Sequence, residues 1–283
     1  MCNLGPIPDS YRGTSDPFLK IFEDPNHGWF LEQSQDLMSQ APRSRYEFVI
    51  DLYELHQRSK DKLTNVRWTG TMPYAAVEHY ERIKSAFRRL RLARSAKQDT
   101  RFVEQEAATY IGLLGHYLAD GSQPLHISIH HDGWQGENPN GYTTDPRIHG
   151  RMETQFVDLI EVKSSDLTPR IGKPAVYDEA FQAIVDHYLK AGRLTGTVYQ
   201  IDKAGGWADK QNQQARELVL QQLAGGAEVM RNLIYTAWVR SGAPMASAGQ
   251  RTSPNDPRNT ANPLSPGNPQ YNPKTGSAPA VKP

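Results

Sequence analysis

The sequence predicts an all-α protein with a single multi-helix domain, and two observations support this fold class. Apolar residues recur at helical spacing in several long segments, whereas no segment shows the alternation of apolar and polar residues that a half-buried strand requires. A chain of 283 residues is also long enough to bury one large core. We place this domain at residues 1–242. Residues 243–283 are dense in Pro, Asn, Ser and Gly, so we expect a disordered, solvated tail that cannot offset its own ordering entropy.

The first two strong helices are predicted at residues 73–95 and 102–118. Apolar residues recur at helical spacing through the first of these segments, and Pro73 at its start is tolerated in a first helical turn. The second segment is rich in Ala and Leu, and its end carries His116 and Asp120. These two side chains are therefore expected where the helix meets the following turn.

A long polar loop and three more helices follow. Residues 127–147 contain three Gly and two Pro, and a loop of this length favours a functional role over a simple connection. Helical patterns then return at residues 148–162, 175–189 and 213–239. The last of these carries an apolar series that ends at Trp238.

Composition limits the classes of function that the chain can have. The formal net charge is +1, so no global field draws the protein to nucleic acid or to an anionic membrane, although a local patch could still bind either. The single Cys2 excludes an intrachain disulfide framework. No apolar stretch approaches the length of a membrane span, and the first residues lack the charged and apolar regions of a signal peptide.

Two motifs in the middle of the chain have the spacing of metal ligands. HYLADGSQPLH covers residues 116–126 and HGRME covers residues 149–153. His116 and Asp120 are four residues apart, as are His149 and Glu153, so each pair lies on one face of a helix. Pro124 bends the chain in between and redirects His126. The sequence therefore predicts a metal centre, and its imidazole and carboxylate ligands suit zinc, manganese or iron.

At these residues the chain resembles the three-zinc superfamily that unites bacterial zinc-dependent phospholipase C with the fungal single-strand-specific nucleases. Both branches carry HxxxD on a helix, then a QPxH turn, then a later helix with HxxxE or HxxxD. The resemblance covers roughly Pro8 to Trp238. It also implies an aspartate and a histidine from the N-terminal part, matched by Asp9 in PDSYR and His27 in DPNHGWFLE. Asp16 and Asp24 lie nearby as alternative carboxylates.

The resemblance implies the following zinc ligands. One zinc ion is held by Asp9, His27, His116 and Asp120, and a second by His126, His149 and Glu153. The family's third zinc ion uses an N-terminal tryptophan and a histidine shortly after it, with Asp120 reaching toward the ion. This chain begins MCNLGPIPD and has neither residue there. We therefore expect two zinc ions and either a truncated form of a longer precursor, which we favour, or a variant without the third site.

The implied reaction is hydrolysis of phosphodiesters, in which Asp9 and Asp120 are the expected catalytic residues and Asp9 orients the attacking water. The distance in sequence between His126 and His149 is nearer the nuclease pattern, whereas Glu153 matches the phospholipase branch. We favour a single-strand nuclease or 3′-nucleotidase-like enzyme acting on single-stranded nucleic acid or nucleotides, with phospholipase C on phospholipid as the alternative. A zinc-binding protein without turnover is a third interpretation. The family is typically secreted or periplasmic, and no protein partner is predicted.

Other residues with functional potential receive structural interpretations. The cluster of Arg88, Arg89, Arg91 and Arg94 is interpreted as a solvated helix face. His56, His79 and His187 have no partner at ligand spacing. His130 and His131 are interpreted as polar loop residues, with substrate contact as the alternative. Trp29, Trp134 and Tyr142 could equally stack on a ligand or pack in the core.

Overall fold

The structure is a computed structural model that describes residues 2–33, 35–59 and 65–243. These ranges contain helices and loops and no strand, so the all-α prediction is confirmed. None of the helices in this part of the chain is long and apolar enough to cross a membrane. Apart from Ala243, the predicted tail lies outside the described residues.

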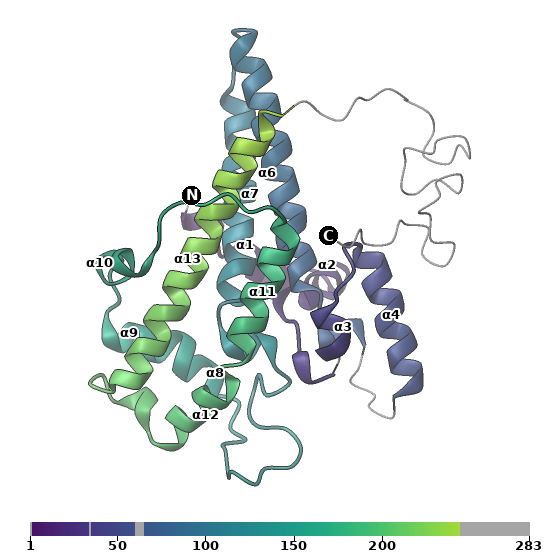
Figure 1. Cartoon of the computed structure of the whole chain (residues 1–283). Coiled ribbons are helices and arrows are strands. Elements are labelled where there is room, and N and C mark those ends of the chain that lie inside the picture. The colour runs from purple at the N-terminus through teal and green to yellow at the C-terminus, as the bar shows by residue number, and fades with distance from the viewer. Residues whose placement is uncertain (1, 34, 60–64, 244–283) are drawn as a thin grey trace.

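Three long helices form the centre of the fold. α6 (Met72–Ser95) and α7 (Arg101–Asp120) make an antiparallel hairpin, and α13 (Gln213–Ser241) packs against both (Figure 1). α11 (Ala180–Gly192) packs on α6 and α13. Each helix contributes side chains with no exposed surface to one apolar core, for example Ile83, Leu114, Ile184 and Leu233. This core fixes the direction of α7, and the C-terminal end of α7 carries His116 and Asp120.

Shorter elements surround the central helices. Before α6 the chain forms η1 (Cys2–Leu4), α1 (Ile7–Thr14), α2 (Pro17–Glu23), η2 (Asp24–His27), η3 (Leu31–Gln33), α3 (Gln35–Ser39), α4 (Arg45–Arg58) and α5 (Val66–Thr69). After α7 it forms η4 (Pro124–Ile127), α8 (Ile148–Gly150), η5 (Arg151–Phe156), α9 (Val157–Ile160), α10 (Ser164–Leu167), η6 (Thr168–Arg170), α12 (Thr195–Lys203) and η7 (Gly206–Ala208).

The long helices agree with the prediction to within a few residues, but two predicted helices differ. The segment predicted as one helix at 148–162 is divided, because η5 is a π-helical turn between α8 and α9, and the segment ends at Glu161 with a φ of 49°. The helix predicted at 175–189 begins only at Ala180. The backbone N–H groups of Ala175 and Tyr177 instead donate to Asn232 and Thr236 of α13, which holds this stretch outside the helix.

A second apolar cluster lies beside the first and is built from η5, α9, α12 and α13. The turn η4 joins the two clusters. Leu125 is fully buried in the second cluster and Ile127 is fully buried in the first. Because both residues are anchored, the position of the intervening His126 is fixed by the packing on either side of it.

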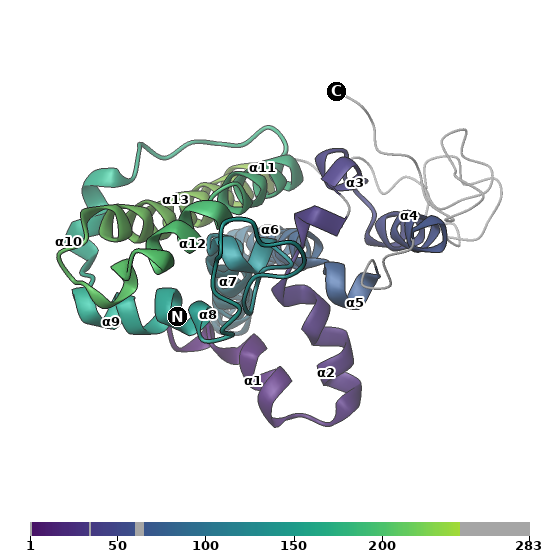
Figure 2. The same ribbon diagram turned by 90° about the horizontal axis from the view of Figure 1, so that it is seen from below.

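The predicted ligand residues come together at one end of the helical bundle. This is the end where α7 stops and where α8, α12 and the loop of residues 128–147 lie (Figure 1). Seen from below, α1 and α2 lie on one side of this end and α8 and α12 on another (Figure 2). The site is therefore assembled from segments that are far apart in the sequence.

Candidate metal centre

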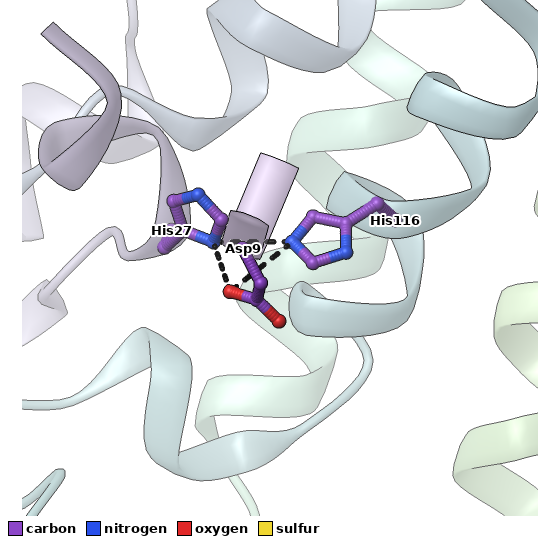
Figure 3. A group of neighbouring side chains, drawn as sticks. All are labelled: Asp9, His27 and His116. Atoms are coloured by element: carbon purple, nitrogen blue, oxygen red, sulfur yellow. Dashed lines mark hydrogen bonds and ion pairs between the residues drawn. The ribbon is translucent and has the colours of Figure 1, made fainter. Parts of the chain in front are cut away.

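Asp9, His27, His116 and Asp120 form the first group of ligand atoms. His27 Nδ1 lies 3.0 Å from Asp120 Oδ2 and 3.1 Å from His116 Nε2, and His116 Nε2 lies 3.3 Å from Asp120 Oδ2. Asp9 Oδ1 is 3.5 Å from His27 Nδ1 and 3.9 Å from His116 Nε2 (Figure 3). Ligands about 2.0–2.1 Å from a tetrahedral zinc ion lie about 3.3 Å from one another. These five separations are close to that spacing, so the four side chains are placed to share one metal ion.

Hydrogen bonding within this group does not account for its geometry. His27 Nδ1 faces a carboxylate oxygen of Asp120, another of Asp9 and a ring nitrogen of His116. A ring nitrogen carries at most one proton, so it can satisfy only one of these three neighbours. A cation that accepts lone pairs from all of them satisfies the whole group, and the donor set therefore fits a metal ion.

Glu23 fixes the orientation of His27 and was not identified from the sequence. Its Oε1 lies 3.2 Å from His27 Nε2 and accepts a 2.5 Å hydrogen bond from the Tyr117 hydroxyl. A carboxylate at this ring nitrogen favours the tautomer with the proton on Nε2 and leaves the Nδ1 lone pair for a metal. Burial opposes the ionisation of Glu23, but hydrogen bonds from His27 and Tyr117 outweigh it and lower the pKa of Glu23.

His126, His149 and Glu153 form the second group. Glu153 Oε2 lies 2.7 Å from His149 Nε2 and 3.4 Å from His126 Nε2. The π-helical turn keeps His149 and Glu153 on the same side although the predicted regular helix is interrupted. Gln123, from the QPLH motif, donates to Glu153 Oε2 at 3.2 Å and so helps to orient this carboxylate.

The hydrogen bonding of His126 also points to a cation. Its Nδ1 donates to the His27 carbonyl oxygen at 2.5 Å, so its Nε2 is the nitrogen that faces Glu153. A lone pair directed at a carboxylate is repulsive unless a proton or a metal ion lies between them. Burial lowers the pKa of His126, but the charge of Asp120 and the contact with Glu153 outweigh burial and raise it to about 9. The surroundings of His126 therefore stabilise positive charge.

The two groups are adjacent. Asp120 Oδ2 of the first group lies 4.0 Å from His126 Nδ1 of the second, and the His126 hydrogen bond to the His27 backbone joins them directly. Four carboxylates, counting Glu23, face four histidines here. The side chains of Glu23 and Asp120 are no more than 14% exposed. Such concentrated negative charge needs compensation, and two divalent ions would supply it.

The structure also separates the alternative carboxylates. Asp16 is exposed at the N-terminal end of α2, and Asp24 is bound by Arg12 and Lys20. Among the described residues, neither belongs to a group of potential metal ligands, whereas Asp9 does. A third group consists of His131, Asp132 and His149, and it shares His149 with the second group.

The two histidines of the long loop differ in their surroundings. His130 stacks on Trp134 with ring centroids 3.7 Å apart, and its Nδ1 accepts from the Gln135 N–H, so it stabilises the loop. His131 donates through Nδ1 to the Leu125 carbonyl, and its ring centroid is 4.2 Å from that of His149. Burial and the neighbouring His126 lower the pKa of His131 to about 3. His131 is therefore a neutral ring beside the second group.

Four further candidates, His79, His187, Trp29 and Tyr142, have structural contacts. His79 stacks on Tyr117, and His187 hydrogen-bonds to the Ser122 hydroxyl. Trp29 is fully buried in the first core cluster. Tyr142 is 9% exposed and packs against Trp134.

The interpretation of the arginine cluster as a solvated face holds only in part. Arg89 and Arg94 pair with Glu106 and Glu104 on the surface. The Arg91 guanidinium instead lies 3.8 Å from the centroid of the Trp238 ring and donates to Ser241, because α13 crosses α6 at this point. Arg91 therefore joins the two helices.

A groove of about 380 Å³ opens beside the ligand groups. His27, His126 and His131 line it, together with the aromatic rings of Phe30 and Trp68. Trp68 is 49% exposed, so its ring offers a flat apolar surface within the groove. A ligand that reaches the metal residues from solvent can do so through this groove.

Comparison with known proteins gives no relative. No protein-family model, no curated protein and no solved structure matches this chain.

Proposed function

We propose that this protein is a zinc-dependent hydrolase of phosphate esters, with two zinc ions held by the two adjacent ligand groups. The single observation that carries the proposal is the convergence of seven predicted ligands into two groups linked through His27, Asp120 and His126. Adjacent zinc ions would supply hydroxide at neutral pH and Lewis-acid stabilisation of the phosphate oxygens. Membership of the three-zinc superfamily and export from the cytoplasm are also part of this proposal.

Asp9 and Asp120 have different tasks in this proposal. Asp9 has a side chain that is 60% exposed, more than any other carboxylate of the two groups, so it can contact both a metal ion and a water molecule from solvent. It would accept a proton from that water and orient the oxygen toward phosphorus. Asp120 would hold His27 and His116 in place and keep its negative charge, because the neighbouring histidines outweigh burial and lower its pKa.

The substrate that we favour is single-stranded nucleic acid or a nucleotide. The groove places exposed Trp68 and the cation of Arg67 beside the metal residues, and an aromatic ring next to a positive charge suits a base and its phosphate. Phospholipase C activity is the second candidate, and one observation favours it. Phe18 and Phe22 on α2 are 82% and 73% exposed and could contact a lipid surface.

Metal analysis combined with a hydrolysis assay tests the proposal. The purified chain should contain about two zinc ions and should cleave single-stranded DNA or RNA faster than it releases product from phosphatidylcholine. Removal of the metal with a chelator should abolish cleavage, and zinc should restore it. Product from lipid alone would favour phospholipase C, and two bound zinc ions without any ester hydrolysis would favour a zinc-binding protein without turnover.

A further inference from the structure

Three basic side chains from three different helices converge on one carboxylate at the groove. Arg12 Nε and Lys20 Nζ lie 3.2 and 2.8 Å from Asp24 Oδ1, and Arg67 Nη2 lies 3.8 Å from Asp24 Oδ2. The cations come from α1, α2 and α5, and Asp24 begins η2, the turn that also holds His27. We call Arg12, Lys20 and Arg67 the cation cluster.

The charges of this cluster do not balance. Three cations face the Asp24 carboxylate. Arg12 also contacts Asp9, which is one of the proposed metal ligands. Burial opposes the ionisation of Asp24, but hydrogen bonds from Lys20 and Arg12 outweigh it and lower its pKa, so the carboxylate stays charged. Asp132 also lines the groove, so three cations meet two carboxylates there and an excess of about one positive charge remains.

The Asp24 carboxylate is more buried than the three cations, so the excess positive charge faces the solvent. The Asp24 side chain is 14% exposed, whereas those of Arg12, Lys20 and Arg67 are 36%, 46% and 54% exposed. All four residues line the same groove as His27 and His126. The carboxylate thus holds the cations from behind while their outer N–H groups remain available to an anion in the groove.

Structural stabilisation alone gives little reason for this arrangement. Exposed ion pairs contribute about 0–1 kcal/mol each, and a single bidentate arginine would satisfy one carboxylate. Three cations at one carboxylate repel one another unless a further anion approaches. Positive groups held together in this way are typical of sites that bind phosphate.

An aromatic surface adjoins the cluster. The Arg67 guanidinium lies 5.4 Å from the centroid of the Trp68 ring, and Trp68 also lines the groove. A base that stacks on an exposed aromatic ring beside an arginine gains both stacking and cation–π stabilisation. A phospholipid has a phosphate but no planar ring to place on Trp68.

We propose that the cation cluster, held by Asp24, is a second phosphate subsite that binds the phosphate next to the one being cleaved, while Trp68 stacks the intervening base. The preferred substrate is then a single-stranded polynucleotide with at least two phosphates in sequence. This inference rests on the proposed phosphate-ester hydrolysis at the metal centre. It goes further because it assigns a second phosphate of the substrate to Arg12, Lys20 and Arg67 together.

Binding of a phosphorothioate-substituted oligothymidylate, which resists cleavage, tests the subsite directly. Fluorescence anisotropy of the zinc-loaded chain at several salt concentrations should show a log–log salt slope that falls by about one unit in Lys20→Ala and in Arg67→Ala. Trp68→Ala should weaken binding about five- to one-hundred-fold. Arg67→Lys keeps the charge and should retain most of the slope. Arg101→Ala is the matched control, because Arg101 is an exposed arginine paired with Asp99 outside the groove.

Kinetics give a second readout that separates this subsite from the metal centre. On oligothymidylate, Lys20→Ala and Arg67→Ala should raise KM with little change in kcat. On bis-p-nitrophenyl phosphate, which has one phosphate, they should match the unsubstituted chain. Equal effects on both substrates, or an unchanged salt slope, would overturn the subsite. Binding to phosphatidylglycerol vesicles that depends on Lys20 and Arg67, without oligonucleotide binding, would overturn it in favour of lipid.

The two proposals fail in different ways. If the zinc-loaded chain hydrolyses no ester, the proposed function fails, but the anisotropy experiment still reports on the cation cluster. If hydrolysis of bis-p-nitrophenyl phosphate is strong and the variants bind oligothymidylate like the unsubstituted chain, the subsite fails and the proposed function survives. Thermal melting of each variant checks that the fold is retained.

Discussion

Glu23 should control the affinity of the first ligand group for zinc, although it is not itself one of the proposed ligands. It faces His27 Nε2 at 3.2 Å, accepts from the Tyr117 hydroxyl at 2.5 Å and is 7% exposed. Loss of a partner that orients a ligating histidine typically weakens metal binding about 10- to 100-fold, or about 1.4–2.8 kcal/mol. Two substitutions should fall at opposite ends of this range.

Glu23→Gln keeps a carbonyl oxygen that can accept from His27 and Tyr117 and removes only the charge. We expect zinc affinity to fall about ten-fold. Glu23→Ala leaves the buried His27 N–H and Tyr117 hydroxyl without an acceptor, so affinity should fall about a hundred-fold. Competition with a chromogenic chelator at pH 7 resolves the two zinc-binding steps, and only one of them should change.

Glu81→Gln is the control, because Glu81 is an exposed residue of α6 that pairs with Lys84. Its zinc affinities should equal those of the unsubstituted chain. If Glu23→Ala binds two zinc ions with unchanged affinity, then either His27 binds no metal or Glu23 does not orient it, and the assignment of the first group is wrong.

Four further outcomes are expected. The His126→Ala and His149→Ala double variant should lose about one zinc ion by atomic absorption, and full zinc content would contradict the second group. Asp120→Asn should lower phosphodiesterase activity about a hundred-fold or more while the chain stays folded at the assay temperature, since it removes charge from a proposed ligand. In the metal-free chain, the raised pKa of His126 contributes stability below about pH 6.5, and this stability is lost as the pH rises toward about 9. The lowered pKa of Asp120 contributes stability that is lost in acid. Urea melts should therefore give a free energy of unfolding with its maximum near pH 5–6. A flat profile would show that His126 and Asp120 do not have these interactions in the folded chain. Gly70→Ala should destabilise by more than about 2 kcal/mol, because φ is +89° and an added Cβ would overlap the Gly28 carbonyl, whereas Gly196→Ala, with open space around it, should be neutral or stabilising.

Local sequence patterns were sufficient for the parts of the site that lie close together in the chain. His116 and Asp120 are both on α7, and a spacing of four residues places them on one helical face in any helix that includes both. The same spacing kept His149 and Glu153 together even though the regular helix that we predicted is interrupted by a π-helical turn. Pro124 likewise marks the turn that presents His126.

The long helices could also be predicted because their apolar periodicity spans many turns. α6 was predicted at 73–95 and α13 at 213–239, and both lie within two residues of the observed bounds. The helices α1 to α5, α10 and α12 were not predicted. Most of them are too short to carry a periodicity that distinguishes them from loops. The 14-residue α4 was missed as well, and only Glu47, Phe48 and Leu52 are buried along it.

By itself, the sequence determined the all-α class, the long helices and the pairs of candidate ligands set by helical spacing. Only the tertiary structure decided which distant groups meet those pairs. His27 reaches His116 across 89 positions because η2 packs on α6 and α7, and Glu23 becomes its partner only in that packing. Arg12 and Arg67 meet at Asp24 for the same reason. Spacing along one helix is fixed by local backbone geometry, whereas contacts between segments depend on how separate apolar faces bury one another.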